Sequence, residues 1–323
     1  MLKITFINVG YGDAILLELI GEGTPYTVLV DGGSGGTVAF LQKLDIRRID
    51  LLVCTHFHVD HVGGLVQVAA QCEIGAFWGP CQREALPEPI AVESAETESA
   101  RLCISGLNAY IGLLEVLDQK KVPITDICGI QQALSLRDGL SVDILGPNQK
   151  RHEALLAYLR KMKGCGPIAC ALDILGEMDA WLNQSSIILR FHYAGKKILL
   201  LSDADRDAIT YLYETPEFLQ ADIVKLAHHG QADAMNERLA AAISPALAVT
   251  CVSSDRRYGS AHPSVYQSLT EWAEANRTPV AFGFSDAVSL DGQGKVDSKL
   301  GFEVRIEHDG SFHTKEIFSV EQK

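Results

Sequence analysis

The sequence predicts an α/β protein, of the α+β kind, in which two mixed β-sheets pack face to face and helices cover the outside. The main observation is an internal repeat: each half contains a hairpin, an aspartate, a helix, a strand and a histidine in the same order. The aspartate and the histidine are 25 residues apart in both halves, from Asp31 to His56 and from Asp203 to His228. Two such units packed together bury both sheets and bring these polar residues to a shared edge.

The composition is the second observation, because it allows a large core. The chain has 323 residues, of which 47% are apolar, enough for one large domain or two small ones. We expect a single domain over 1–323, with largely helical insertions at about 81–138 and 148–182. No run of roughly 18 apolar residues occurs, so no membrane span is expected.

The net charge of −13 limits the partners that the surface can attract. A broad affinity for nucleic acid needs a basic surface, so the charge leaves only local attraction of phosphate to a metal site. The N-terminus shows no basic and apolar leader, and the eight cysteines show no Cys-x-x-Cys pair. We therefore expect a cytoplasmic protein with reduced thiols, including Cys165 and Cys170, the closest pair.

The elements of the first half follow from the spacing of apolar residues and glycines. Residues 3–20 are expected to form two strands around a turn at 10–12, and 26–30 to form the next strand. A short helix is expected over 37–48, followed by a buried strand at 50–54.

Both insertions carry apolar residues at helical spacing. In the first, 101–121 is expected to be one long helix, which either packs on the core or forms a lid or dimer face over the site. In the second, a helix is expected at 152–163, and the apolar stretch 168–181 either packs in the core or shapes a substrate pocket. The remaining chain is expected to form strands at 139–147, 187–192, 197–201, 222–227 and 246–252, helices at 206–214, 236–243 and 264–276, a loop at 256–263, and two or three short final strands.

The turn after the strand at 50–54 places four metal-binding side chains within six residues, namely His56, His58, Asp60 and His61. Alternation along the chain sends the first two histidines one way, while the aspartate and the last histidine lie further round the bend. One cation could therefore bind the first pair and a second cation the other pair. Imidazole and carboxylate suit Zn²⁺, with Mn²⁺ or Fe²⁺ as substitutes. A surface cluster of polar residues is the alternative.

Further residues are candidates for the same centre. Asp203 ends a fully apolar strand, where a lone carboxylate is costly to bury unless it is capped or bound to a metal. His228 and His229 follow another buried strand, and one of them should complete the ligands of the second cation. The repeat favours His228, because it mirrors His56. Asp31 is expected to hydrogen-bond to a ligand rather than to bind a metal.

The run from His56 to His61 matches His-x-His-x-Asp-His, the signature of the metallo-β-lactamase superfamily, and the chain resembles that family over most of its length. It resembles more closely the soluble hydrolase domain of the DNA-uptake protein ComEC and its free-standing relatives. Three stretches carry this closer resemblance: Asn8-Val9-Gly10-Tyr11-Gly12-Asp13-Ala14-Ile15-Leu16, Ile198-Leu199-Leu200-Leu201-Ser202-Asp203 and Val224-Lys225-Leu226-Ala227-His228-His229-Gly230. Tyr11, Ser202 and Gln231 replace the usual Gln, Gly and Ser of those relatives, and each change can alter the substrate.

The resemblance implies an αββα sandwich, a metal-dependent hydrolase and two divalent cations. Asp203 would be the carboxylate that bridges both cations, and alignment of the glycine after the histidine pair favours His229 over His228. The family usually offers a third histidine to the first cation. This chain has Asn183, a weak zinc ligand, 20 residues before Asp203, as the ComEC-like branch does. Asp13 is expected to contact a ligand rather than a metal.

These features favour a hydrolase of a phosphodiester or related phosphoester, with a small or short substrate and a metal-bridging hydroxide as nucleophile. Asp60 is expected to be catalytic as a ligand, and His262 to contact the phosphate or protonate the leaving group. Arg256 and Arg257 can hold an anion. The alternatives are an acyl hydrolase acting on a lactone, lactam or thioester, and a non-catalytic metal-binding module of the same fold.

Overall fold

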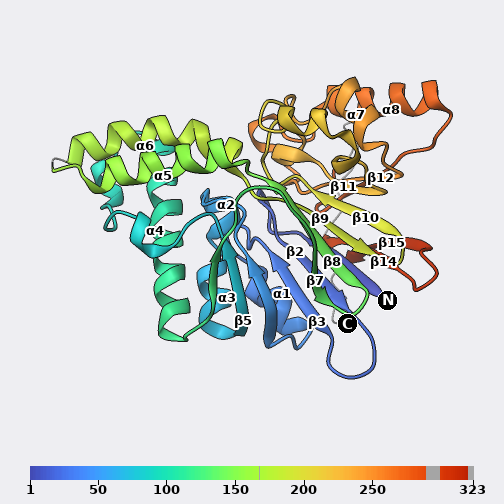
Figure 1. Cartoon of the computed structure of the whole chain (residues 1–323), viewed down its shortest axis with the longest axis horizontal. Coiled ribbons are helices and arrows are strands. Elements are labelled where there is room, and N and C mark those ends of the chain that lie inside the picture. Colours follow the sequence, from blue (N-terminus) through green and yellow to red (C-terminus); the bar gives the residue numbers. More distant parts are fainter. Residues whose placement is uncertain (167, 289–298, 319–323) are drawn as a thin grey trace.

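Two mixed β-sheets pack face to face in the computed structural model, which describes residues 1–166, 168–288 and 299–318 (Figure 1). The first sheet has the order β15 (Phe312–Phe318), β14 (Lys299–Ile306), β1 (Leu2–Ile7), β2 (Ile15–Leu19), β3 (Tyr26–Val30), β4 (Arg48–Val53), β5 (Glu73–Gly79) and β6 (Ile124–Asp126). The second has the order β13 (Ala281–Phe284), β12 (Leu247–Thr250), β11 (Ile223–Lys225), β10 (Lys196–Leu200), β9 (Ile188–Tyr193), β8 (Leu140–Gly146) and β7 (Gln131–Arg137).

The internal repeat expected from the sequence is present in the strand pairing. β1 to β6 lie side by side in chain order, as do β8 to β13. In each set the first two pairings are antiparallel and the last three are parallel. Asp50 and Asp222 also correspond, since each carboxylate accepts from a backbone N–H of the preceding strand, that of Thr27 or Lys197, at 2.9 Å. The two halves are therefore built on one supersecondary plan.

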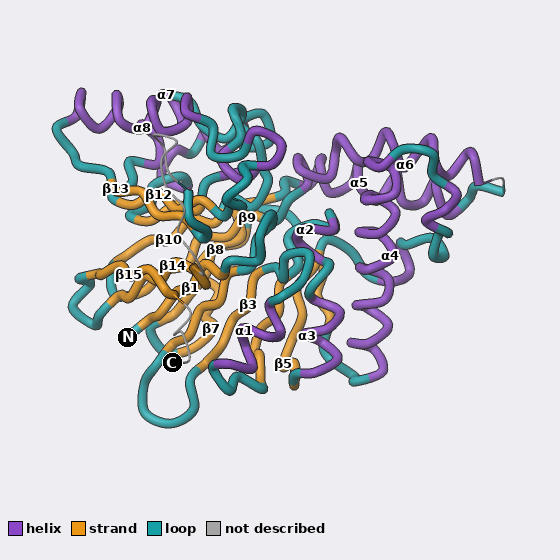
Figure 2. Tube along the Cα trace, turned by 180° about the vertical axis from the view of Figure 1, so that it is seen from behind, coloured by secondary structure: helices purple, strands orange, loops and turns teal. Residues whose placement is uncertain are grey.

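Helices cover both outer faces, which confirms the predicted αββα layering (Figures 1 and 2). Over the first sheet lie α1 (Thr37–Lys43), α2 (Val59–Val62), α3 (Leu65–Gln71) and α4 (Glu98–Gln119). Over the second lie α7 (Glu237–Ile243) and α8 (Pro263–Asn276). A hairpin of α5 (Gln149–Lys163) and α6 (Ile168–Leu182) stands beside α4, away from α7 and α8 (Figure 2). Short 3-10 helices occur at Arg83–Ala85, Val92–Ser94, Asn183–Ser185, Thr210–Glu214, Pro216–Phe218, Ala227–Gly230 and Arg257–Gly259.

Three buried apolar clusters hold these layers together, one between the sheets and one on each outer face. Successive residues of a strand point to opposite faces, so each strand serves two clusters. In β2, Ile15 and Leu17 join the cluster between the sheets, whereas Leu16 joins the helix-covered one. Each such fully buried side chain contributes about 1.5–3 kcal/mol relative to an exposed one.

Two helices differ from the sequence-based expectation. The segment 206–214 forms turns and a 3-10 helix, because the Asp205 carboxylate accepts from the N–H groups of Asp207 and Ala208 and tightens the chain there. α1 ends earlier than expected, just before Asp45, which has a positive φ of 52°.

The strands β5, β6 and β7 were not expected from the sequence. β6 has only three residues, and β7 is a mostly exposed edge strand in which just Leu134 and Leu136 pack partly against the core, so both signals are short. Because β6 joins the first sheet and β7 the second, the segment 81–138 is not wholly a helical insertion. It also contains the crossing from one sheet to the other.

α4 is the long helix expected in the segment 81–138. Within the described part of the chain, it alone is long and apolar enough by composition to cross a membrane. Half of its most apolar window is buried inside the protein, as in the core helix of a globular protein. Ile104, Leu107 and Tyr110 on its buried face join the cluster over the first sheet.

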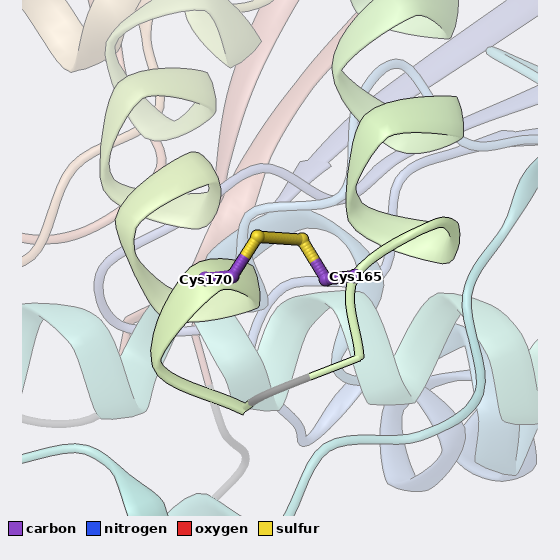
Figure 3. The surroundings of a disulfide bond; sticks show 2 residues. All are labelled: Cys165 and Cys170. Atoms are coloured by element: carbon purple, nitrogen blue, oxygen red, sulfur yellow. A yellow bond between two sulfur atoms is a disulfide. The ribbon is translucent and has the colours of Figure 1, made fainter.

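The α5–α6 hairpin corrects the expectation that all cysteines are reduced. Cys165 and Cys170 form a disulfide (Figure 3), with Cα atoms 5.9 Å apart. The hairpin turn brings the end of one helix to the start of the next, which places the pair within the usual distance range for a disulfide. The other six cysteines are free thiols, and five of them are buried.

A buried ion pair joins β8, β9 and the 3-10 helix at 216–218. Arg190 donates to the Asp143 carboxylate at 2.7 Å and to the carbonyl oxygen of Phe218 at 2.8 Å. Burial alone would raise the pKa of Asp143, but hydrogen bonds from the Ala133 N–H, Arg190 and His192 outweigh it and lower this pKa.

Replacing Asp143 with Ala should lower the free energy of unfolding at pH 7 by about 3–5 kcal/mol, because Arg190 stays buried without its partner. A depressed carboxylate pKa gives stability that is present above the unfolded pKa and lost as the pH falls through the folded one. The difference from wild type should therefore shrink below about pH 4. Urea unfolding of wild type, the variant and the exposed control Asp138→Ala checks this, and equal stability of all three at pH 7 would contradict it.

Candidate metal centre

The candidate ligands meet where parallel strands of the two sheets end. β4 runs directly into the turn that carries His56 and His58 and then into α2, which carries Asp60 and His61. Asp203 follows β10, and His229 follows β11, the parallel neighbour of β10. Because parallel neighbours end at the same edge of a sheet, residues far apart in the sequence come together here.

Four of these residues form one group whose donor atoms lie within 4.8 Å of one another: Asp60, His61, Asp203 and His229. His229 Nε2 lies 3.1 Å from Asp60 Oδ2 and 3.3 Å from Asp203 Oδ2. His61 Nε2 also lies 3.3 Å from the same Asp203 oxygen. Both histidine rings are fully buried.

A second group contains His56, His58 and Asp203, so Asp203 belongs to both groups. His56 Nε2 lies 3.0 Å from His58 Nδ1 and 4.0 Å from Asp203 Oδ2. The first turn thus divides between two groups as the alternation of its side chains predicted. The shared carboxylate lies between them.

The donor set fits two divalent cations. His61 Nε2 and Asp203 Oδ1 are buried and have no hydrogen-bond partner among the described residues. Unpartnered buried polar atoms are costly, and His61 Nε2 faces the carboxylate oxygens of Asp203 at 3.3 Å and of Asp60 at 3.8 Å. Imidazole nitrogens and carboxylate oxygens converging on two points are the ligands that zinc and related metals take.

The other ring nitrogen of each buried histidine is held by a core residue. His61 Nδ1 lies 2.8 Å from Asp31, whose carboxylate also accepts from the N–H and hydroxyl of Thr55. His229 Nδ1 lies 3.3 Å from Asp13. Asp13, Asp31 and His61 also form a third cluster whose donor atoms lie within 4.8 Å of one another. The role of Asp31 and Asp13 as partners of ligands rather than as ligands stays a prediction. Such partners fix which nitrogen faces the cation.

Charges tune these rings in opposite directions. Burial and the charges of His61 and His58 lower the pKa of His56 well below its usual value. Burial would also lower the pKa of His61 and of His229, but nearby carboxylates, Asp203 first, outweigh it and raise both. The carboxylates of the four-residue group thus stabilise positive charge in it, on the imidazole rings or on a cation.

Lys225 is a buried residue that the sequence reasoning left without a role. Its ammonium group pairs with Asp13, donates to the Ser202 carbonyl oxygen at 3.0 Å and lies 3.8 Å from Asp203 Oδ1. Burial raises the pKa of Asp13, but Lys225, His229 and His61 together outweigh it, and the pKa falls to about 2. A single lysine inside the apolar run Ile223–Leu226 was the sequence signal for this pair.

His228 and His229 have separate places. Both have left-handed backbone angles, with φ of 45° and 50°, so the chain turns sharply and sends the two rings apart. His228 lies outside both groups: its Nδ1 is 3.0 Å from Asp233, and its Nε2 is 3.2 Å from Asn183 Nδ2. The repeat argument pointed to His228, but the structure groups His229. The strand-level repeat does not extend into this turn.

The remaining sequence candidates also separate. His262 is exposed, and its ring caps α8 by accepting a hydrogen bond from the Ser264 N–H. It does not belong to the residues that line the cavity described below. Arg256 donates to the Ala261 carbonyl oxygen of its own loop. Arg257 does line the cavity and pairs with Asp255 at 2.9 Å.

A cavity of about 1010 Å³ opens over the two groups. One wall comes from the start of α4 and the end of α6, and the other from the loop after β12. The residues that line it are Val9, Gly10, Tyr11, Ser34, His58, Val59, Asp60, Glu98, Ser99, Leu102, Cys103, Asp179, Asn183, Asp203, His228, Gln231, Ser253, Ser254, Asp255, Arg257, Tyr258 and Asp286. The two insertions therefore contribute to the site.

The sequence did not point to Asp179 or Tyr11 as cavity residues. The Tyr11 ring lies 4.4 Å from the His229 ring and 5.1 Å from that of Tyr258. Tyr11 was noted only as a departure from the ComEC-like pattern, which was the one sequence signal for it. Asp179 sits within an apolar helix, where an acidic residue was the only hint.

Replacing His229 with Ala should remove about one equivalent of bound metal, whereas His228→Ala should keep both, because only His229 faces the donor atoms of the four-residue group. Elemental analysis of the two purified variants beside wild type checks this. The reverse pattern would support the repeat argument instead, and unchanged metal in both variants would reject both assignments.

The sequence profile of the metallo-beta-lactamase superfamily matches residues 7–135. No curated protein sequence matches the chain significantly. Similar solved structures include YhfI, a metallo-beta-lactamase fold protein from Bacillus subtilis, with 14% identity, 90% of this chain and 98% of that chain covered, and a TM-score of 0.44. A diphosphatase of the PhnP family is similar with 12% identity, coverage of 95% and 98%, and a TM-score of 0.44. Human tRNase Z, short form, is similar with 15% identity, coverage of 90% and 97%, and a TM-score of 0.39.

The closer resemblance to the hydrolase domain of ComEC stays a prediction. The profile match carries the His-x-His-x-Asp-His turn, and the two mixed sheets with outer helices have the metallo-beta-lactamase architecture. Residues 7–135 thus match the metallo-beta-lactamase superfamily, and the fold of the described residues is a metallo-beta-lactamase fold.

Proposed function

We propose that the chain is a dinuclear-metal-dependent hydrolase of small or short phosphoesters, with phosphodiesters favoured. The observation that carries the proposal is the sharing of Asp203 between two donor groups at the floor of one cavity. His56, His58 and Asp203 would hold the first cation, and Asp60, His61, Asp203 and His229 the second. Zn²⁺ is the cation that this donor set favours, with Mn²⁺ or Fe²⁺ as substitutes.

The first cation has fewer side-chain ligands than the second. Asn183 is the nearest addition, because its Oδ1 is buried without a hydrogen-bond partner while its Nδ2 faces His228. When bound, the two cations would acidify a water molecule and polarise the phosphoryl group. The protein's part is to fix the ligand rings and to shape the cavity around the substrate.

The charge balance of the centre supports an anionic substrate. Two divalent cations would carry more positive charge than the carboxylates of Asp60 and Asp203 that bind them directly, since Lys225 and Asp13 cancel each other. Negative charge that develops on phosphoryl oxygens is stabilised in such a centre. Arg257 lines the same cavity and can bind the outer part of the substrate.

The cavity wall supports a small substrate rather than a polymer. Glu98, Asp179, Asp255 and Asp286 line it, and Arg257 is the one cationic side chain among its described lining residues. The net charge of −13 over the chain opposes the binding of a long nucleic acid. The rings of Tyr11 and Tyr258 offer an apolar face to the organic part of the ester.

A cytoplasmic location remains a prediction. The five buried free thiols are compatible with a reducing compartment, whereas the bond between Cys165 and Cys170 is not what such a compartment favours.

Bis-nitrophenyl phosphate should be hydrolysed with a higher kcat/KM than nitrocefin or a simple lactone, because the centre and Arg257 favour spread phosphoryl charge. A chromogenic panel with the metal-loaded protein measures this. Turnover of a lactone or lactam with phosphodiesters untouched would move the assignment to acyl chemistry. No turnover of any ester would favour the non-catalytic alternative.

Replacing Asp60 with Ala should deplete the second cation and lower phosphodiester hydrolysis by more than roughly 100-fold, since loss of a ligand's outer partner alone typically costs about 10–100-fold. Metal content and initial rates are measured together, with Asp309→Ala, an exposed residue outside the cavity, as the control. Full activity of the Asp60 variant, or of metal-free wild type, would reject a metal mechanism.

A further inference from the structure

We propose that Asp179 of α6 is a positioning residue for the first cation, so that the α5–α6 hairpin is part of the metal centre. The inference rests on the proposed function only in taking the two donor groups to hold cations. It makes the first cation dependent on a helix outside the two sheets.

The contact is direct. His58 Nε2 lies 3.1 Å from Asp179 Oδ1, while His58 Nδ1, on the other side of the ring, lies 3.0 Å from His56 Nε2. The Asp179 carboxylate accepts a hydrogen bond from Nε2–H. The ring proton is therefore on Nε2, and the lone pair of Nδ1 is free for the cation. Asp179 thus selects both the ring orientation and the tautomer that the first group needs.

His58 is the one histidine among the ligand candidates that lacks a partner in the core. Its side chain is 20% exposed, whereas those of His56, His61 and His229 are at most 1% exposed. His58 precedes the four-residue helix α2, with no side chain capping that helix. The local chain therefore does little to hold the ring, and Asp179, 121 residues away, has to do so.

α6 is anchored in a way that can deliver this contact. Leu175, Met178 and Leu182 lie buried on one side of the helix, in the cluster that also contains the buried side of α4. Asp179 lies on the cavity side, and Asn183, one turn further on, also lines the cavity and faces His228. The end of α6 therefore touches the site at two points.

The first group also has fewer donor residues than the second. It has three clustered donor residues, against four in the second group. Removing the support of one ligand out of three should weaken the first cation selectively, while the second group keeps its core partners Asp31 and Asp13. Unequal loss of the two cations is thus the signature of this role, and a general loss of structure would not produce it.

The test is a stepwise titration of metal-free protein with Zn²⁺ and with Co²⁺, followed by bound equivalents after dialysis and by Co²⁺ absorption. Wild type should take up two equivalents. Asp179→Ala should keep one tight equivalent and bind the other about 10–100-fold more weakly. Asp179→Asn, whose amide oxygen still accepts from Nε2, should lie between them. Asp173→Asn, an exposed aspartate on the same helix, should match wild type.

A double-mutant cycle with His58→Ala separates positioning from packing. If Asp179 acts through His58, adding Asp179→Ala to His58→Ala should change metal binding no further. Two unchanged equivalents in Asp179→Ala, or equal weakening of both, would overturn the inference. Thermal unfolding of the metal-free variants checks their folding, and Asp179→Asn decides the matter if the alanine variant does not fold.

This outcome is independent of the reaction. Wild type that takes up two equivalents but hydrolyses no phosphoester would reject the proposed function and leave the role of Asp179 standing. Phosphodiester hydrolysis together with two unchanged equivalents in Asp179→Ala would do the opposite.

Discussion

The buried carboxylate of Asp203 is the constraint on which the rest of the centre depends. It is 2% exposed, with one oxygen 3.3 Å from both His61 and His229 and the other facing Lys225. A charge in this position is tolerated only if positive charge surrounds it on every side. Lys225, which is itself paired with Asp13, faces one oxygen of Asp203. The two donor groups that share Asp203 would supply the rest of the positive charge through their cations. The need to neutralise the Asp203 carboxylate therefore explains why Lys225 and the metal-binding side chains gather at the cavity floor.

The two halves share a strand plan but contribute unequally to the site. Asp31 and Asp203 end corresponding strands, yet Asp31 hydrogen-bonds to His61 through Nδ1, whereas Asp203 faces the donor groups directly. The first half supplies four ligand candidates from a single turn, and the second supplies Asp203 and His229 to the two donor groups from separate loops. Repetition thus builds a symmetric scaffold, while short loops decide the chemistry, because loops change without disturbing the buried sheets.

The segments outside the shared plan form the walls. The start of α4 and the end of α6 lie across the cavity from the loop that carries Arg257 and Tyr258. Several acidic side chains on these walls oppose a polyanion, while the centre itself attracts a single negative group. Under the proposed function, the contrast between a cation-loaded floor and an acidic rim would set the specificity, and it would let an acidic chain act on a small anionic ester.

The sequence by itself determined the sheets, the repeat and the metal-binding turn, because period-two apolar runs and the spacing from His56 to His61 are local properties of the chain. It did not reveal β5, β6 or β7, the last a mostly exposed edge strand with only two partly buried leucines, or which of His228 and His229 joins the donor group. The choice between His228 and His229 depends on the left-handed backbone of both residues in one tight turn. Only the tertiary structure decided that Asp179 reaches His58, since that contact joins residues brought together by the docking of α6, and no local pattern encodes such docking.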